Sequence, residues 1–103
     1  MTTTELAPET EAILSLAASL LDAAGSAAAA MAPPQVGLPC LLAAQLLERA
    51  GGRASRVSLI EGEIRPTIRA AMSTMARLDD DTFGTDDVLH AARAARRALN
   101  ELD

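Results

Sequence analysis

Apolar residues recur every three or four positions between Val57 and Leu78. This spacing places them on one face of a helix, so the segment cannot form a strand without breaking the pattern. Gly62 and Pro66 lie on the opposite side of the helix. Two structures are therefore open: a long third helix kinked near Pro66, or a short helix, a turn at residues 61–65 and a second helix that starts at Pro66. The predicted seam consists of Val57, Ile60, Ile64, Ile68, Met72 and Met75.

The composition favours helices throughout the 103-residue chain. Alanine, the residue with the highest helix propensity, occurs 23 times, and Phe83 is the one aromatic residue. Alanine buries little surface, so a core must come from Leu, Ile, Val and Met, each worth roughly 1.5–3 kcal/mol when fully buried. We predict an all-α fold, a small bundle of about four helices, with residues 1–7 as a flexible N-terminal tail and residues 8–103 as one domain.

The first half of the chain predicts two helices joined by a turn. One begins near Pro8 and ends at residues 25–26 or continues to Met31. Residues 32–39 contain three prolines and a glycine, which predict a rigid connector. The next helix should run from Pro39 to Ala50. Its expected core residues are Leu41, Leu42, Leu46 and Leu47.

Glycines and a helix-capping residue mark two further boundaries. Gly51 and Gly52 should stop the second helix. The last helix should begin after Thr85 as its N-cap, because Asp86 and Asp87 suit the positive end of a helix.

Charge is segregated along the sequence. Residues 1–48 hold five acids and no base, residues 49–78 hold six arginines against two acids, and residues 79–103 hold seven acids against three arginines. This division predicts pairing within the fold or with another subunit. All nine basic residues are arginine, and the GC-rich codons of Arg, Ala, Gly and Pro suggest a bacterial source.

The sequence predicts a cytoplasmic protein that does not insert into a membrane. A single cysteine cannot form an intrachain disulfide, which suits a reducing compartment. The acidic N-terminus lacks the positive charge of a signal peptide. Residues 23–47 form an uncharged run, but prolines and glycines interrupt it.

Residues 41–78 resemble, in outline, the helix-turn-helix core of bacterial winged-helix regulators. Gly62 stands at the position of the turn glycine, and Ile68 and Met72 stand where a recognition helix packs inward. The resemblance implies that residues 53–77 contact nucleic acid with outward side chains. The implied contacts are Arg53, Arg56, Arg65, Thr67 and Arg69. Glu61 and Glu63 depart from the family pattern, and no wing hairpin follows.

No catalytic, cofactor or metal site is predicted. Cys40 and His90 each occur once without a third group that the sequence brings to them, and residues 79–90 match a calcium loop at only three positions. We expect Cys40 to be a small apolar residue in the interior and His90 to be partly buried. The leading functional prediction is a protein–protein interaction module, either a homodimer or an accessory subunit of a larger partner. A helix-turn-helix regulator that binds nucleic acid is the alternative.

Overall fold

The computed structural model describes residues 7–31, 33–55 and 63–102. These residues form five helices and no strand, which confirms the predicted all-α class. The helices are α1 (Pro8–Met31), α2 (Pro34–Arg49), α3 (Ile64–Met75), α4 (Asp80–Phe83) and α5 (Asp86–Leu102).

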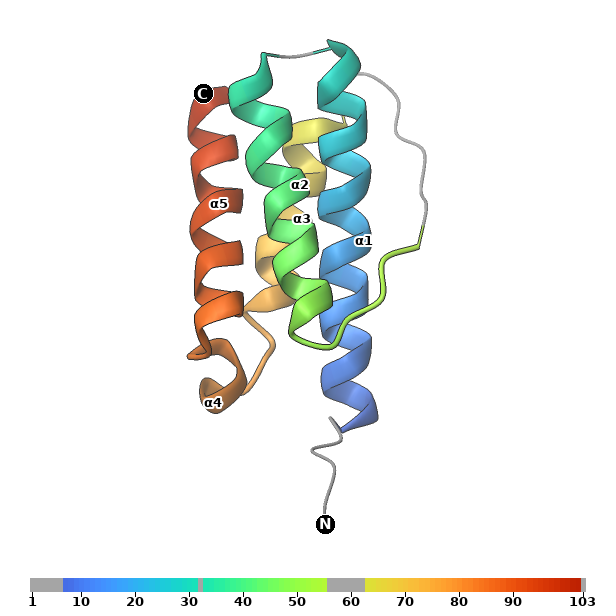
Figure 1. The fold of residues 1–103 in the computed structure, drawn as a ribbon, viewed down its shortest axis with the longest axis vertical. Coiled ribbons are helices and arrows are strands. Elements are labelled where there is room, and N and C mark those ends of the chain that lie inside the picture. Colours follow the sequence, from blue (N-terminus) through green and yellow to red (C-terminus); the bar gives the residue numbers. More distant parts are fainter. Residues whose placement is uncertain (1–6, 32, 56–62, 103) are drawn as a thin grey trace.

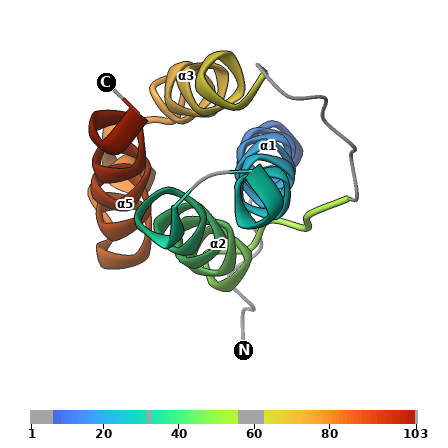
Figure 2. The ribbon, with the colours of Figure 1, turned by 90° about the horizontal axis from the view of Figure 1, so that it is seen from above.

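The four longer helices form a bundle, and α4 is a single turn at one end (Figure 1). Viewed along the bundle axis, the helices follow one another around a ring in the order α1, α2, α5, α3 (Figure 2). Each of these neighbouring pairs is in contact and runs antiparallel (Figure 1). The connection from α2 to α3 must therefore cross from one end of the bundle to the other, as in bundles with a long crossover.

Small residues keep α1 and α2 close together. A Cβ atom built on Gly25 would lie 2.7 Å from Cγ of Leu41, and one on Gly37 would lie 3.3 Å from the carbonyl oxygen of Gly25. Both glycines are helical and buried. Gly25 therefore allows α1 to pack closely against α2 and does not end the helix. Helix α1 continues to Met31, which is the second of its two predicted ends.

The predicted connector at residues 32–39 is wrong over most of its length. Helix α2 begins at Pro34, five residues before the predicted start, and contains both Gly37 and Pro39. Proline is favoured at the first helical position, where Pro34 stands, whereas Pro39 lies in the second turn and leaves the carbonyl of Gln35 without its helical N–H donor. Gln35 is exposed, so water can supply that donor.

The end of α2 confirms the predicted glycine stop. Gly51 has a φ of 121°, which L side chains rarely adopt. The Gly51 N–H donates to the Glu48 carbonyl, and the Gly52 N–H donates to the Leu47 carbonyl, each at 3.0 Å. This pair of bonds is the Schellman arrangement. Gly52 then passes over α1, where a Cβ atom would lie 2.8 Å from the backbone of Leu14.

Two serines of α1 hold the first part of the crossover. Oγ of Ser15 accepts from the Arg53 N–H at 3.0 Å, and Oγ of Ser19 accepts from the Ser55 N–H at 2.8 Å. The Ser19 hydroxyl also donates to the Ser15 carbonyl at 2.8 Å. The backbone N–H groups of Arg53 and Ser55 thus gain the acceptors that a helix or a sheet would otherwise supply.

Helix α3 begins at Ile64, with Glu63 as its N-cap, and places Pro66 in the first turn. A continuous helix through residues 56–78 is therefore wrong, because Glu63 is outside the helix and α3 ends at Met75. Proline fits the first turn since its missing N–H needs no partner there. The short helix and turn that the alternative placed before Pro66 fall mainly on residues 56–62, which lie outside the described residues.

The start of the last helix agrees with the prediction, and the structure adds the short helix α4 before it. Asp79 caps α4, since its carboxylate accepts from the Thr82 N–H at 2.7 Å. Helix α5 begins at Asp86, as predicted. The Thr85 hydroxyl donates to the Thr82 carbonyl at 2.8 Å and so links the two helices.

Candidate interaction surface

Two leucines of α2 are exposed although their helix lies in the bundle. Leu38 is 64% exposed and Leu42 is 48% exposed, whereas Cys40 and Leu47 of the same helix are fully buried. Leu38 and Leu42 are four residues apart and lie on one side of the helix, with Pro34 one turn before them. This side faces away from the core, so the prediction that Leu42 is a core residue is wrong.

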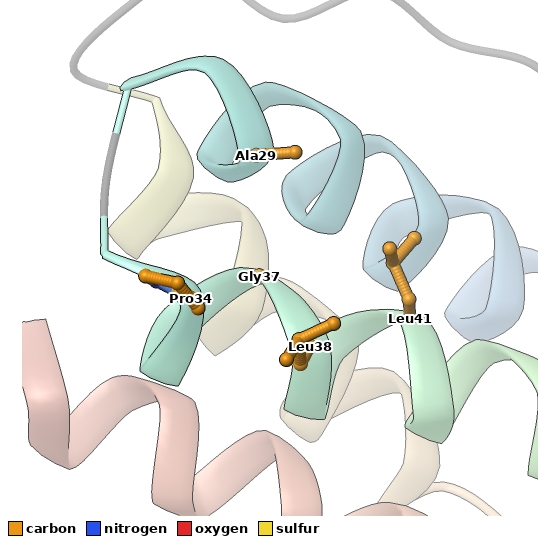
Figure 3. A pocket seen from close by; sticks show the side chains of 5 residues that line it. All are labelled: Ala29, Pro34, Gly37, Leu38 and Leu41. Atoms are coloured by element: carbon orange, nitrogen blue, oxygen red, sulfur yellow. The ribbon is translucent and has the colours of Figure 1, made fainter.

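A hollow of about 240 Å³ lies between α1 and the beginning of α2. Figure 3 shows Leu38 and Leu41 projecting from α2, and Ala29 projecting from α1. No charged side chain lines this hollow. Its lining residues are Ala29, Pro34, Gly37, Leu38 and Leu41.

Two further hollows lie between α2 and α5. The first, of about 390 Å³, has Leu42 and Leu46 on one side and His90, Arg93, Ala94 and Arg97 on the other. The second, of about 320 Å³, is lined by Pro34, Gln35, Leu38, Pro39, Arg97 and Glu101. Arg97 lines both of these hollows, and Leu38 lines the second one and the hollow beside α1. The three hollows are therefore neighbouring parts of one surface.

We name this surface the α2–α5 face and define it by Pro34, Leu38, Leu42, Arg93 and Arg97. The leucines form an apolar ridge on α2, and the arginines form a parallel basic row on α5. The hollows between α2 and α5 hold two arginines against one glutamate, Glu101, in a chain of net charge −5. The face therefore carries a net positive charge, which is opposite in sign to the charge of the chain as a whole.

An ion pair closes the far end of the α2–α5 groove. Nη2 of Arg49 lies 3.9 Å from Oδ1 of Asp87, and the Arg49 side chain is largely exposed. Such a pair contributes little to stability. It marks the antiparallel register of the two helices, in which Arg49 lies opposite Asp87 and Pro34 lies near Glu101.

The seam predicted for a protein partner lies largely in the interior. Ile64, Ile68 and Met75 are buried in the core, and Met72 is half-buried against it. Val57 and Ile60 lie outside the described residues. A partner cannot reach Ile64, Ile68 and Met75 in the folded chain, because α3 packs these side chains against α1 and α5. These three side chains therefore belong to the core and do not form a surface for a partner, whereas the predicted seam as a whole stays a prediction.

The residues predicted to contact nucleic acid are placed on different elements. Arg53 is in the crossover beside α1, and Arg65 and Arg69 are exposed on α3. Thr67 is buried, so the expectation that it points outward is wrong. Arg65 donates from Nη2 to the Leu102 carbonyl. Arg56 lies outside the described residues, and nucleic-acid binding stays a prediction.

Cys40 is buried, as predicted, whereas the expectation of a partly buried His90 is wrong, since His90 is exposed on α5. Burial raises the pKa of the Cys40 thiol to about 11, so the thiol is protonated at neutral pH. The hydrogen bonds of Asp79 to Thr82 lower the pKa of that carboxyl. Within the described residues, no group of three or more His, Cys, Asp or Glu side chains is placed to hold a metal ion.

One helical segment of the described chain, Pro8–Ala30, is long and apolar enough to cross a membrane. Half of its most apolar stretch is buried inside the bundle. Core helices and signal sequences share this composition, so the cytoplasmic location stays a prediction. The uncharged run at residues 23–47 is not one span, because it is divided at Pro33 between α1 and α2.

Comparison with protein-family models, with curated proteins and with solved structures finds no match to this chain. The candidate site therefore rests on geometry alone. Leu38, Arg93 and Arg97 were not predicted as site residues from the sequence. A usable signal was present, because Pro34, Leu38 and Leu42 have helical spacing, and so do Arg93 and Arg97.

Proposed function

We propose that this chain is a protein-docking module that acts as an accessory subunit and binds its partner through the α2–α5 face. The observation that carries the proposal is the exposure of Leu38 and Leu42 on one side of α2. Full burial of a large aliphatic side chain is worth roughly 1.5–3 kcal/mol, so a partner that covered both leucines would gain a substantial share of its binding free energy there.

The shape of the face suits a helix-in-groove mode of binding. Helix α2 has 16 residues and is therefore about 24 Å long. Hollows flank its leucine ridge on both sides, toward α1 and toward α5. A partner helix laid along the ridge would place its own apolar side chains in these hollows.

Leu16 of α1 provides a matched control for exposure. It is 46% exposed, close to the 48% of Leu42. Nine residues separate Leu16 from Gly25, which is half a turn around the helix. Because Gly25 faces Leu41 of α2, Leu16 faces away from α2 and lines none of the three hollows of the candidate surface.

Photo-crosslinking inside the expressing cell tests the proposal. A photoreactive amino acid would replace Leu38, Leu42 or Leu16 in three separate variants. We expect one protein to be crosslinked in high yield from positions 38 and 42 and not from position 16. A second copy of the chain as that product would support self-association through the same face. Equal crosslinking from all three positions would overturn the proposal.

A paired substitution then connects contact with affinity. Leu38→Ser combined with Leu42→Ser should abolish the complex and leave the melting temperature nearly unchanged, because both side chains are exposed. Leu16→Ser should leave the complex intact. Loss of the complex in the Leu16 variant would indicate that the binding surface lies on α1.

A further inference from the structure

We infer that the partner segment is an acidic amphipathic helix, with apolar residues that cover Leu38 and Leu42 and carboxylates that pair with Arg93 and Arg97. The inference rests on the proposed docking function and specifies the chemistry of the partner. The evidence for an acidic partner is the basic row of Arg93 and Arg97, which lies beside the leucines.

The spacing of the two rows fits a single helix. Leu38 and Leu42 are one turn apart on α2, and Arg93 and Arg97 are one turn apart on α5. A helix that lies over the groove presents residues at positions i and i+4 to each row. Apolar side chains would face α2, and on the adjacent side of the same helix aspartate or glutamate would face α5. Guanidinium groups bind carboxylates in a bidentate geometry, which adds orientation to affinity.

A second copy of the chain fits the face less well. A two-fold interface whose axis runs across α2 and α5 would bring Arg93 and Arg97 of both copies together, so four like charges would share one patch. An asymmetric contact would need an acidic amphipathic helix on this chain's own surface. The acidic start of α1 carries Glu9 and Glu11, but Ile13 and Leu14 are buried. Leu16 is the one exposed large apolar residue among the described side chains of this helix, so they offer no pair of exposed leucines one turn apart.

Nucleic acid would satisfy only half of the face. Phosphates could pair with Arg93 and Arg97, but they would leave the ridge of Leu38 and Leu42 without an apolar contact. A peptide helix with one apolar and one acidic side matches both rows.

Selection from a displayed library of helical peptides tests the inference. Each peptide carries two leucines four residues apart, and all other surface positions are random. The purified full chain is the target, and the Leu38→Ser/Leu42→Ser variant is the counter-target. We expect enrichment of peptides with aspartate or glutamate one turn apart beside the leucine row, and no enrichment on the counter-target.

A charge reversal then tests which arginines determine the affinity for the acidic peptide. Affinity for an enriched acidic peptide is compared with affinity for its counterpart in which lysines replace the acids. Arg93→Glu/Arg97→Glu should weaken the acidic peptide by about tenfold or more and should strengthen binding of the lysine counterpart. Arg69→Glu/Arg96→Glu makes the same change in net charge on exposed residues that do not line the α2–α5 hollows. This control should change either affinity by no more than about twofold.

The outcomes separate the inference from the function on which it rests. Enriched peptides that are neutral or basic, and that still require Leu38 and Leu42, would overturn the inference that the partner helix is acidic. They would still support the proposal that the α2–α5 face is a docking surface. Enrichment that persists on the Leu38→Ser/Leu42→Ser variant, or no enrichment at all, would overturn both. Circular dichroism of each variant should match the parent chain, because every substituted residue is exposed.

Discussion

Two apolar stripes of this protein have similar spacing and opposite surroundings. Ile64, Ile68 and Met75 of α3 are buried, whereas Leu38 and Leu42 of α2 are about half exposed or more. In both stripes the side chains recur at helical intervals. Periodicity therefore identifies which residues share a face, but it does not identify which faces the fold covers.

The difference comes from how many apolar sides each helix has. Helix α3 has one apolar side and exposed polar residues opposite, including Arg65 and Arg69, so packing that side on α1 and α5 leaves no large apolar side chain of α3 exposed. Helix α2 is apolar on two sides. Its inner side contributes Val36, Cys40 and Leu47 to the core, and with two close neighbours it cannot bury Leu38 and Leu42 as well.

The largest effect should come from a charge placed in the α3 stripe. Ile64→Asp would bury a carboxylate without a partner, at a cost of several kcal/mol, which is comparable to the stability of a whole domain of this size. We expect loss of the cooperative thermal transition in circular dichroism. Leu38→Asp is the control on the other stripe and should remain folded. A folded Ile64→Asp variant would show that the two stripes do not differ in burial.

A smaller effect should separate the two sides of α2 itself. Leu47→Ala removes a fully buried side chain and should lower the free energy of unfolding by about 2–5 kcal/mol. Leu42→Ala, on the exposed side, should change it by less than about 0.5 kcal/mol. Urea denaturation of both variants measures the difference. Equal losses would place Leu42 in the core after all.

Each serine of α1 that binds the crossover should contribute the free energy of about one hydrogen bond to the stability of the fold. Ser19→Ala removes the acceptor of the Ser55 N–H and should cost about 1 kcal/mol. Ser26→Ala, at an exposed position of the same helix, gains the same helix propensity without losing that bond. The difference in urea midpoint between the two variants measures the loss of the Ser19 hydroxyl bonds, to the Ser55 N–H and to the Ser15 carbonyl. If Ser26→Ala is destabilised as much as Ser19→Ala, the bond to Ser55 contributes nothing.

Cys40, on the buried side of α2, should affect stability only at alkaline pH. The unfolded thiol ionises near its ordinary pKa of 9.0, and the buried thiol keeps its proton up to about 11. Unfolding therefore releases a proton between these values, so stability falls as pH rises through that window and is unaffected below it. The chain contains no lysine or tyrosine, so no other side chain has its ordinary pKa there.

Urea melts at pH 8 and pH 10.5 test this expectation, with Cys40→Ala as the control. The parent chain should lose stability between the two pH values, and the alanine variant should lose less. An identical loss in both would indicate that the thiol is not shielded from water.

Most helices could be predicted from local chemistry, and the failures have local reasons as well. Pro8, the glycine pair 51–52 and the acidic turn at 86–87 mark helix ends by capping and backbone preference, which depend on few neighbours. Pro34, Gly37 and Pro39 suggested a connector because each one disfavours a helix by itself. The close contact of Gly37 with α1 supplies packing that outweighs those preferences.

The helical class, the apolar periodicity of each helix and the position of most helix ends follow from local sequence, because they depend on residues within a few turns of one another. Only the packing of the helices makes the α3 stripe core and leaves Leu38 and Leu42 on the surface, since burial depends on which helices surround a face. It also brought Arg93 and Arg97 beside those leucines from more than fifty residues away. The candidate site exists only because α2 and α5 pack side by side and antiparallel.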